Sequence, residues 1–140
     1  MPATILVVED HDDVRRALQD WLEAEFLQCC VIEAASGEEA IALTGIESPT
    51  LVIMGIRLPG MSGIEATRQI KAILPSVQIV MLTIHTGDIY RADAKAAGAS
   101  AYVTKQRMHS DLVPTLAALL ANAVPDGQKV RHWHLQPNDR

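Results

Sequence analysis

Five short apolar runs, each followed by a segment of helical period, constrain the fold of this 140-residue chain more than any other feature. We expect strands at Thr4–Val8, Cys29–Ala34, Leu51–Met54, Val77–Leu82 and Ala101–Thr104. We expect helices over about Asp12–Phe26, from the cap Ser36 to about Thr44, from the cap Ser62 to before Pro75, over Asp88–Ala97, and from the cap Ser110 to near Ala123. Strands that alternate with helices form a parallel sheet covered by helices on both faces. The pattern therefore predicts a doubly wound α/β fold.

Composition and charge exclude several classes of protein. Hydrophobic residues make up 49% and charged residues 21% of the chain, which is typical of a globular domain rather than a disordered one. A net charge of −5 argues against a surface built to bind nucleic acid. The N-terminus does not resemble a secretory signal, and no apolar run approaches the ~20 residues that span a bilayer. The neighbouring Cys29 and Cys30 cannot form a disulfide framework. We therefore expect a cytoplasmic domain without a membrane segment.

Polar residues gather where the expected strands end. The residues at these positions are Glu9, Asp10, Gly55, Thr83 and Lys105. In parallel α/β sheets the carboxyl ends of the strands share one edge, and ligands bind there. Gly55 has no side chain to contribute, although the other four residues are suited to surround a carboxylate. The sequence thus predicts a polar site with a gap at position 55.

Four motifs carry a resemblance to a known family. They are Ile5–His11, Ile56–Gly63, Met81–Thr83 and Ala97–Lys105, in this order and at matching spacing. Over about residues 4–122 the chain resembles the receiver domain of response regulators in two-component signalling, and it is most similar to the receivers of LuxR-type regulators. The resemblance implies a flavodoxin-like sheet of five parallel strands in the order 2-1-3-4-5. Around Val124–Gly127 the chain turns polar and loses its periodicity, so we expect a receiver domain over residues 1–124 and a tail over residues 125–140.

The resemblance implies a role for each residue of the predicted site. In the family, an aspartate on the third strand takes a phosphoryl group from a phosphohistidine of a partner. Glu9, Asp10 and the backbone carbonyl of Arg57 would hold Mg²⁺. The Thr83 hydroxyl and the Lys105 ammonium would contact the phosphoryl group. Gly55 occupies the acceptor position and departs from the family pattern, so the phosphoryl input should be lost and Mg²⁺ binding weakened.

Each of these residues also has a simpler interpretation. A Glu-Asp pair after a strand can cap the next helix, and a threonine or lysine at a strand end is often structural. Asp12 and Asp13 fall at the start of the first helix, where their charges favour the helix dipole, so neither replaces the acceptor. In the absence of an aspartate at position 55, Lys105 could pair directly with Asp10 and leave the site without metal.

A second surface is implied by the same resemblance. In receivers, the residues corresponding to Thr83 and Tyr102 respond together and alter the face made by the fourth helix, fifth strand and fifth helix. On this chain we assign to that switch and output face His85, Tyr90, Arg91, Lys95 and Tyr102. Its implied role is docking of a protein partner, such as a sensor histidine kinase, or homodimerisation. A solvated charged face is the alternative.

The tail contains the basic and aromatic stretch Lys129–Leu135. One interpretation is that this stretch contacts nucleic acid or a partner. The favoured interpretations are a frayed terminus or an extension of the chain that packs on the domain.

The sequence predicts a receiver that works by binding proteins, is not an enzyme, and touches neither membrane nor nucleic acid directly. Two alternatives stay open. In the first alternative, Gly55 is a substitution in an otherwise phosphorylatable regulator. In the second, the chain is the receiver part of a DNA-binding transcriptional regulator. A Mg²⁺-dependent phosphatase is less favoured, because no spare nucleophile is visible.

Overall fold

A single parallel sheet organises the molecule. The computed structural model describes residues 3–84 and 87–123. Its sheet has five strands in the order β2-β1-β3-β4-β5, and every pairing is parallel. The strands are β1 (Thr4–Val8), β2 (Cys30–Ala34), β3 (Leu51–Met54), β4 (Gln78–Thr83) and β5 (Ala101–Thr104). This confirms the predicted fold class and strand order.

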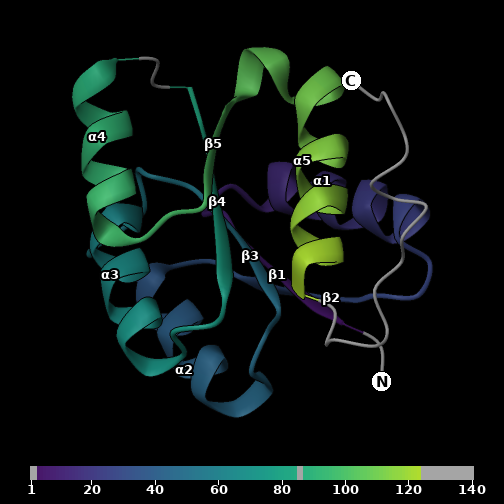
Figure 1. Cartoon of the computed structure of the whole chain (residues 1–140), viewed down its shortest axis with the longest axis horizontal. Helices are drawn as coiled ribbons and strands as arrows, with labels where there is room; N and C mark the ends of the chain where they lie inside the picture. The colour runs from purple at the N-terminus through teal and green to yellow at the C-terminus, as the bar shows by residue number, and fades with distance from the viewer. Residues whose placement is uncertain (1–2, 85–86, 124–140) are drawn as a thin grey trace.

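Five α-helices cover the two faces of the sheet among the described residues. They are α1 (Asp12–Glu25), α2 (Gly37–Glu47), α3 (Gly63–Ile73), α4 (Asp88–Ala97) and α5 (Met108–Ala123), the last preceded by a 3₁₀ turn at Lys105–Arg107. Helices α1 and α5 lie on one face, and α2, α3 and α4 lie on the other (Figure 1). None of these helices has the length and apolar character that a membrane span requires.

The central strand β3 explains why there are two hydrophobic cores. All four of its residues are buried. Leu51 and Ile53 pack with α1 and α5, whereas Val52 and Met54 pack with α2, α3 and α4. Successive side chains of a strand point to opposite faces, so an uninterrupted apolar run supplies both cores.

Two predicted helix caps are confirmed. The side-chain oxygen of Ser36 accepts a hydrogen bond from the backbone N–H of Glu39, and that of Ser62 accepts one from Glu65. Each bond satisfies one of the free N–H groups at the start of its helix. Helix α2 runs past the predicted end near Thr44 and stops at Glu47, where Ser48 adopts a left-handed conformation with φ of 46°.

The predicted start of the last helix was wrong. Helix α5 begins at Met108, because the 3₁₀ turn leads directly into it and no cap is needed at Ser110. The Ser110 hydroxyl instead donates to the carbonyl oxygen of Arg107 at 3.1 Å. Pro114 lies inside this helix. The predicted tail, residues 125–140, lies outside the described residues.

A close backbone contact fastens α3 to the end of β3. The N–H of Gly63 donates to the carbonyl oxygen of Ile56 at 2.8 Å. A Cβ atom built on Gly63 would lie 1.7 Å from the carbonyl oxygen of Gly55. Since both partners are backbone, neither can turn aside, and only glycine fits at position 63.

We predict that Gly63→Ala lowers the free energy of unfolding by about 2 kcal/mol or more, because α3 must shift away from β3 to admit the methyl group. Chemical denaturation of the purified protein measures this. Gly45→Ala is the matched control: Gly45 lies inside α2, and an added Cβ meets nothing within 4 Å. The control should stabilise the protein by roughly 0.5–1 kcal/mol. Equal stability of the two variants would contradict the contact.

Candidate functional site

The register of the sheet brings the predicted site residues to one edge. Val8 of β1 is paired with Met54 of β3, and Met54 with Met81 of β4. Glu9 and Gly55 each come one residue after this row. Thr83 ends β4 beside Thr104 of β5. The strands therefore present Glu9, Asp10, Gly55, Thr83 and Lys105 at the same carboxyl edge, as the sequence predicted.

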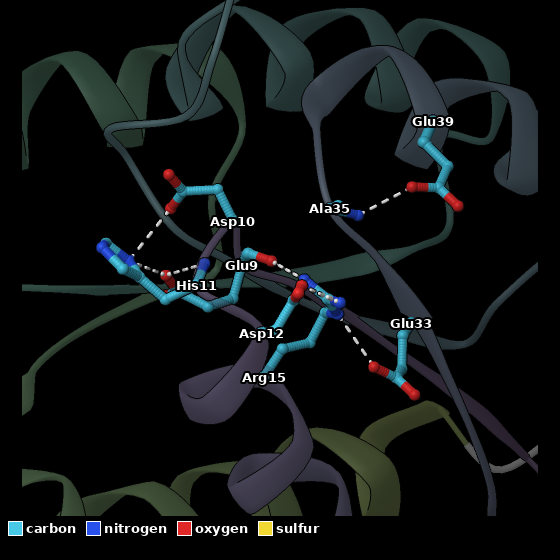
Figure 2. Close-up of polar contacts among 8 residues, drawn as sticks. All are labelled: Glu9, Asp10, His11, Asp12, Arg15, Glu33, Ala35 and Glu39. Carbon is cyan, nitrogen blue, oxygen red and sulfur yellow. Dashed lines mark hydrogen bonds and ion pairs between the residues drawn. The ribbon is translucent and has the colours of Figure 1, made fainter.

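Glu9 is the charged centre of this edge. Its backbone N–H donates to the carbonyl oxygen of Ala34, and its residue surface is 5% exposed. Its Oε2 accepts a hydrogen bond from the backbone N–H of His11 at 3.2 Å and lies 3.1 Å from the His11 Nδ1 (Figure 2). The same ring nitrogen is 3.3 Å from Asp10 Oδ1. The His11 ring thus bridges the two carboxylates.

Lys105 completes the set of contacts around Glu9. Its Nζ donates to Glu9 Oε1 at 3.2 Å, so both carboxylate oxygens of Glu9 are engaged. The suggested pairing of Lys105 with Asp10 was wrong. The buried Glu9 carboxylate takes the lysine, while Asp10 lies beside the exposed His11.

These contacts change the protonation equilibria at the edge. Burial by itself would raise the pKa of Glu9, but the hydrogen bonds from His11 and the Lys105 charge outweigh it and hold that pKa below its usual value. The pKa of His11 is raised, chiefly by its hydrogen bond to Glu9 and also by the Asp10 charge. Both shifts favour the charged forms, a carboxylate beside an imidazolium.

Arg15 holds this loop in place. Its Nη1 donates to the Glu9 carbonyl oxygen at 2.7 Å, and its Nε donates to Glu33 Oε1 at 2.8 Å (Figure 2). Its Nη2 bonds Asp12 Oδ1 at 2.6 Å. One planar guanidinium therefore ties the end of β1 to β2 and to the start of α1.

Gly55 is buried but has room for a side chain. A Cβ there would lie 3.5 Å from the Val8 carbonyl oxygen, 3.6 Å from Leu58 Cδ2 and 3.7 Å from Glu9 Oε1, all ordinary contact distances. Its φ is not left-handed, in contrast to Gly60 and Gly98. Neither space nor backbone conformation at position 55 requires glycine. A side chain there would lie next to the carboxylate that Lys105 binds.

The edge fits Mg²⁺ poorly as it is arranged. Ligand atoms of Glu9, Asp10 and His11 lie within 4.8 Å of one another. Mg²⁺ prefers oxygen ligands in octahedral geometry, however, and both Glu9 oxygens already have cationic or N–H partners. Gly55 supplies no side-chain oxygen, and Arg57 is exposed in the loop after β3. A cation would have to displace Lys105 or the His11 contacts.

Two residues of the predicted output face, Arg91 and Tyr102, make a cation–π contact. The Arg91 guanidinium carbon lies 4.5 Å above the ring of Tyr102, which is half-buried, as is Tyr90. Burial raises the pKa of Tyr102. Lys95 is exposed, and so are the apolar side chains of Ile84 and Ile89. His85 lies outside the described residues.

Comparisons with known proteins agree with this geometry. The family model described as the response regulator receiver domain matches residues 5–117. The chain belongs to this family. Receiver domains are signalling modules of two-component systems, in which they interact with sensor kinases and dimerise.

Relatives of known sequence and structure extend the match. The chain is 34% identical over 118 residues to response regulator protein VraR of Staphylococcus saprophyticus, a match that covers 83% of this chain and 56% of the relative. VraR of Staphylococcus aureus is 37% identical over 114 residues, with 80% and 54% coverage. The chain thus spans about half the length of these curated relatives.

Two solved structures share the fold. A two-component response regulator of the LuxR family from Aurantimonas sp. superposes with a TM-score of 0.81 at 33% identity, covering 97% of this chain and all of that one. A CheY-like receiver domain protein from Methanospirillum hungatei gives a TM-score of 0.81 at 26% identity, covering 88% of this chain and 97% of the other.

Sequence reasoning missed two residues of the site. His11 belonged to the first motif but received no role, although an imidazole next to two carboxylates is a signal for a charge-assisted contact. The role of Arg15 could not be found from spacing, because Arg15 lies on α1 and its partner Glu33 lies on β2, distant along the chain.

We predict that Arg15→Met lowers the free energy of unfolding by about 1 to 3 kcal/mol, since it leaves the Glu9 carbonyl and the Glu33 carboxylate without their charged donor. Thermal and denaturant unfolding measure this. Arg16→Met is the control, because the neighbouring Arg16 is exposed on the same helix. It should change stability by no more than about 0.5 kcal/mol. Equal effects of the two variants would show that the Arg15 contacts do not contribute to the free energy of unfolding.

Proposed function

We propose that this receiver transmits no phosphoryl signal through position 55 and acts by binding protein partners in the cytoplasm, without being an enzyme. The observation that carries the proposal is Gly55. Gly55 follows β3 at the carboxyl edge and offers no side-chain oxygen to accept a phosphoryl group. A Cβ atom built at this position would lie 3.7 Å from Glu9 Oε1. Family resemblance gives position 55 the acceptor role.

The contacts of Lys105 support this proposal. Family resemblance gives Lys105 the task of contacting the phosphoryl group, together with Thr83. Its ammonium is instead bound by Glu9, which is largely shielded from water. An ion pair in such surroundings is weakly screened, and removing one partner would leave an uncompensated charge. The pair therefore holds the edge in one arrangement without a phosphoryl ligand.

Mg²⁺ binding belongs to the same proposal. The remnant ligands Glu9 and Asp10, with the carbonyl of Arg57, form a vestigial metal site in which Lys105 and His11 neutralise the carboxylates. Because the third carboxylate is missing at position 55, the affinity for Mg²⁺ is low.

The face of α4, β5 and α5 is the proposed interaction surface, and a second copy of the chain or a sensor histidine kinase is the proposed partner. Exposed Ile84 and Ile89 lie at the β4 and α4 sides of this face, with cationic Arg91 and Lys95 close in sequence. Apolar side chains surrounded by charges are typical of protein interfaces. Arg91 stacked on Tyr102 holds the aromatic ring against the domain.

We predict that the unaltered protein is not labelled when it is incubated with Mg²⁺ and acetyl phosphate, whereas Gly55→Asp gains one phosphoryl group. The aspartate would fit the space at position 55, beside the Glu9 carboxylate that Lys105 binds and at the same edge as Thr83. Intact mass spectrometry measures the adduct. Gly55→Asn is the matched control, since its amide has nearly the same shape but is not a nucleophile. Stoichiometric labelling of the unaltered protein would contradict the proposal.

The same three proteins test the metal site by calorimetric titration with Mg²⁺. Gly55→Asp should bind Mg²⁺ at least about tenfold more tightly than the unaltered protein, equivalent to about 1.4 kcal/mol. Gly55→Asn should bind weakly, because it adds no charge. Tight, stoichiometric Mg²⁺ binding by the unaltered protein would show that its site is not vestigial.

We predict that combined Arg91→Glu and Lys95→Glu substitutions weaken self-association at the output face at least about tenfold, or about 1.4 kcal/mol. Sedimentation equilibrium over a range of protein concentrations measures the dissociation constant. Arg16→Glu is the control for a general charge effect, because Arg16 is exposed on α1, which lies on the other face of the sheet from α4. A protein that stays monomeric at every concentration would exclude the second copy as the partner.

A further inference from the structure

The imidazole of His11 joins two carboxylates at the carboxyl edge, in a geometry that suits a different class of cation from Mg²⁺. Its Nδ1 lies 3.1 Å from Glu9 Oε2 and 3.3 Å from Asp10 Oδ1 (Figure 2). Ligand atoms of the three residues lie within 4.8 Å of one another. Over residues 3–84 and 87–123, no other group of three histidine, cysteine or acidic side chains comes together in this way.

The two distances from Nδ1 are long for hydrogen bonds between charged partners. A charged N–H group normally lies about 2.7–2.9 Å from the carboxylate oxygen that accepts from it. The Nδ1 atom carries at most one N–H, which cannot point at Glu9 and Asp10 together. A metal ion forms a separate bond to each ligand atom. The position between these three side chains therefore suits an ion better than a shared hydrogen.

We propose that Glu9, Asp10 and His11 bind a divalent transition ion such as Zn²⁺ through Oε2, Oδ1 and Nδ1. Zn²⁺ binds imidazole nitrogen and carboxylate oxygen at about 2.0–2.2 Å in tetrahedral geometry, so neighbouring ligand atoms are about 3.3–3.5 Å apart. The distances of 3.1 and 3.3 Å from Nδ1 are close to this value. The Asp10 side chain is 33% exposed, so it can turn and bring its oxygen toward Glu9.

The kinds of ligand atom select this class of ion over Mg²⁺. Imidazole suits Zn²⁺, Ni²⁺ and Cu²⁺, whereas carboxylates, carbonyls and water suit Mg²⁺. Gly55 supplies no carboxylate to the edge, and the His11 nitrogen takes the place of an oxygen in the ligand set. The inference rests on the proposed function in one respect, namely that the magnesium site is vestigial.

Lys105 keeps its partner when the ion binds. Its Nζ donates to Glu9 Oε1, whereas the ion takes Glu9 Oε2. The ion replaces the contacts of the His11 ring with the carboxylates and does not displace the lysine. A histidine that binds a metal is neutral. Lys105 offsets one of the two carboxylate charges, so one negative charge remains to attract the ion.

The backbone already holds the ligands in this arrangement. Arg15 Nη1 donates to the Glu9 carbonyl oxygen at 2.7 Å, and the Arg15 backbone N–H donates to the His11 carbonyl oxygen at 2.9 Å. Because this loop is ordered before binding, little binding free energy is lost in ordering it. The His11 side chain is 73% exposed, so water can complete the coordination of the ion.

Nitrogen-15 NMR of the histidine rings in the full chain tests the site. In a titration with Zn²⁺ we expect the His11 Nδ1 resonance to shift, whereas Mg²⁺ at the same concentrations leaves it in place. His11→Gln identifies this resonance by its loss. The amide resonances of residues 9–12 give the dissociation constant at this edge, whatever ion binds elsewhere on the chain. A His11 Nδ1 resonance that Zn²⁺ does not shift would overturn the proposal.

Matched variants separate ligation from a general attraction between charges. Asp10→Asn and His11→Gln should each weaken Zn²⁺ binding at least about tenfold, since losing even an outer partner of a metal ligand costs about 10–100-fold. Asp13→Asn is the control, because Asp13 is an exposed carboxylate in the first turn of α1. It should change the dissociation constant by no more than about twofold, since solvent screens such charges. Equal effects of Asp10→Asn and Asp13→Asn would contradict ligation.

The two metals distinguish failure of this inference from failure of the proposed function. Weak binding of both Zn²⁺ and Mg²⁺ at the edge would overturn the inference and leave the vestigial magnesium site standing. Tight Mg²⁺ binding by the unaltered protein would overturn both.

Discussion

The burial of β3 at the centre of the sheet is the constraint on which the rest of the structure depends. Its four residues divide between the two cores, two to each side. The strand is also paired in register with β1 and with β4. A slip by one residue would exchange the side chains of the two cores, so the register is strongly specified. This register in turn decides which residues emerge together at the carboxyl edge.

At that edge, the placement of charge follows from the burial of Glu9. A carboxylate so shielded from water is costly unless it is paired and hydrogen-bonded. His11 and Lys105 supply those partners from α1's N-terminal loop and from the end of β5. Arg15 then secures the backbone of the same loop through the Glu9 carbonyl. The edge is a neutralised network, which accounts for its poor fit to a further cation.

Two glycines near the edge have different physical meanings. Gly63 is required by packing, because any Cβ would collide with the backbone of Gly55. Gly55 is not required in this way, since a side chain would meet its neighbours at ordinary distances. Packing therefore explains why residue 63 is glycine, whereas it gives no reason for glycine at position 55. Position 55 is where the family resemblance expects the phosphoryl acceptor. A glycine there that packing does not require supports a receiver that takes no phosphoryl input.

The sequence by itself determined the fold class, the strand positions to within one residue, the caps Ser36 and Ser62, and the gathering of Glu9, Gly55, Thr83 and Lys105 at one edge. These follow from local periodicity and from the rule that parallel strands share their carboxyl edge. Only the tertiary structure decided that Lys105 binds Glu9 rather than Asp10, that Arg15 reaches Glu33, and that α5 starts before Ser110. Those outcomes depend on which side chains are buried, on partners distant in the chain, and on how a 3₁₀ turn joins the helix, none of which periodicity encodes.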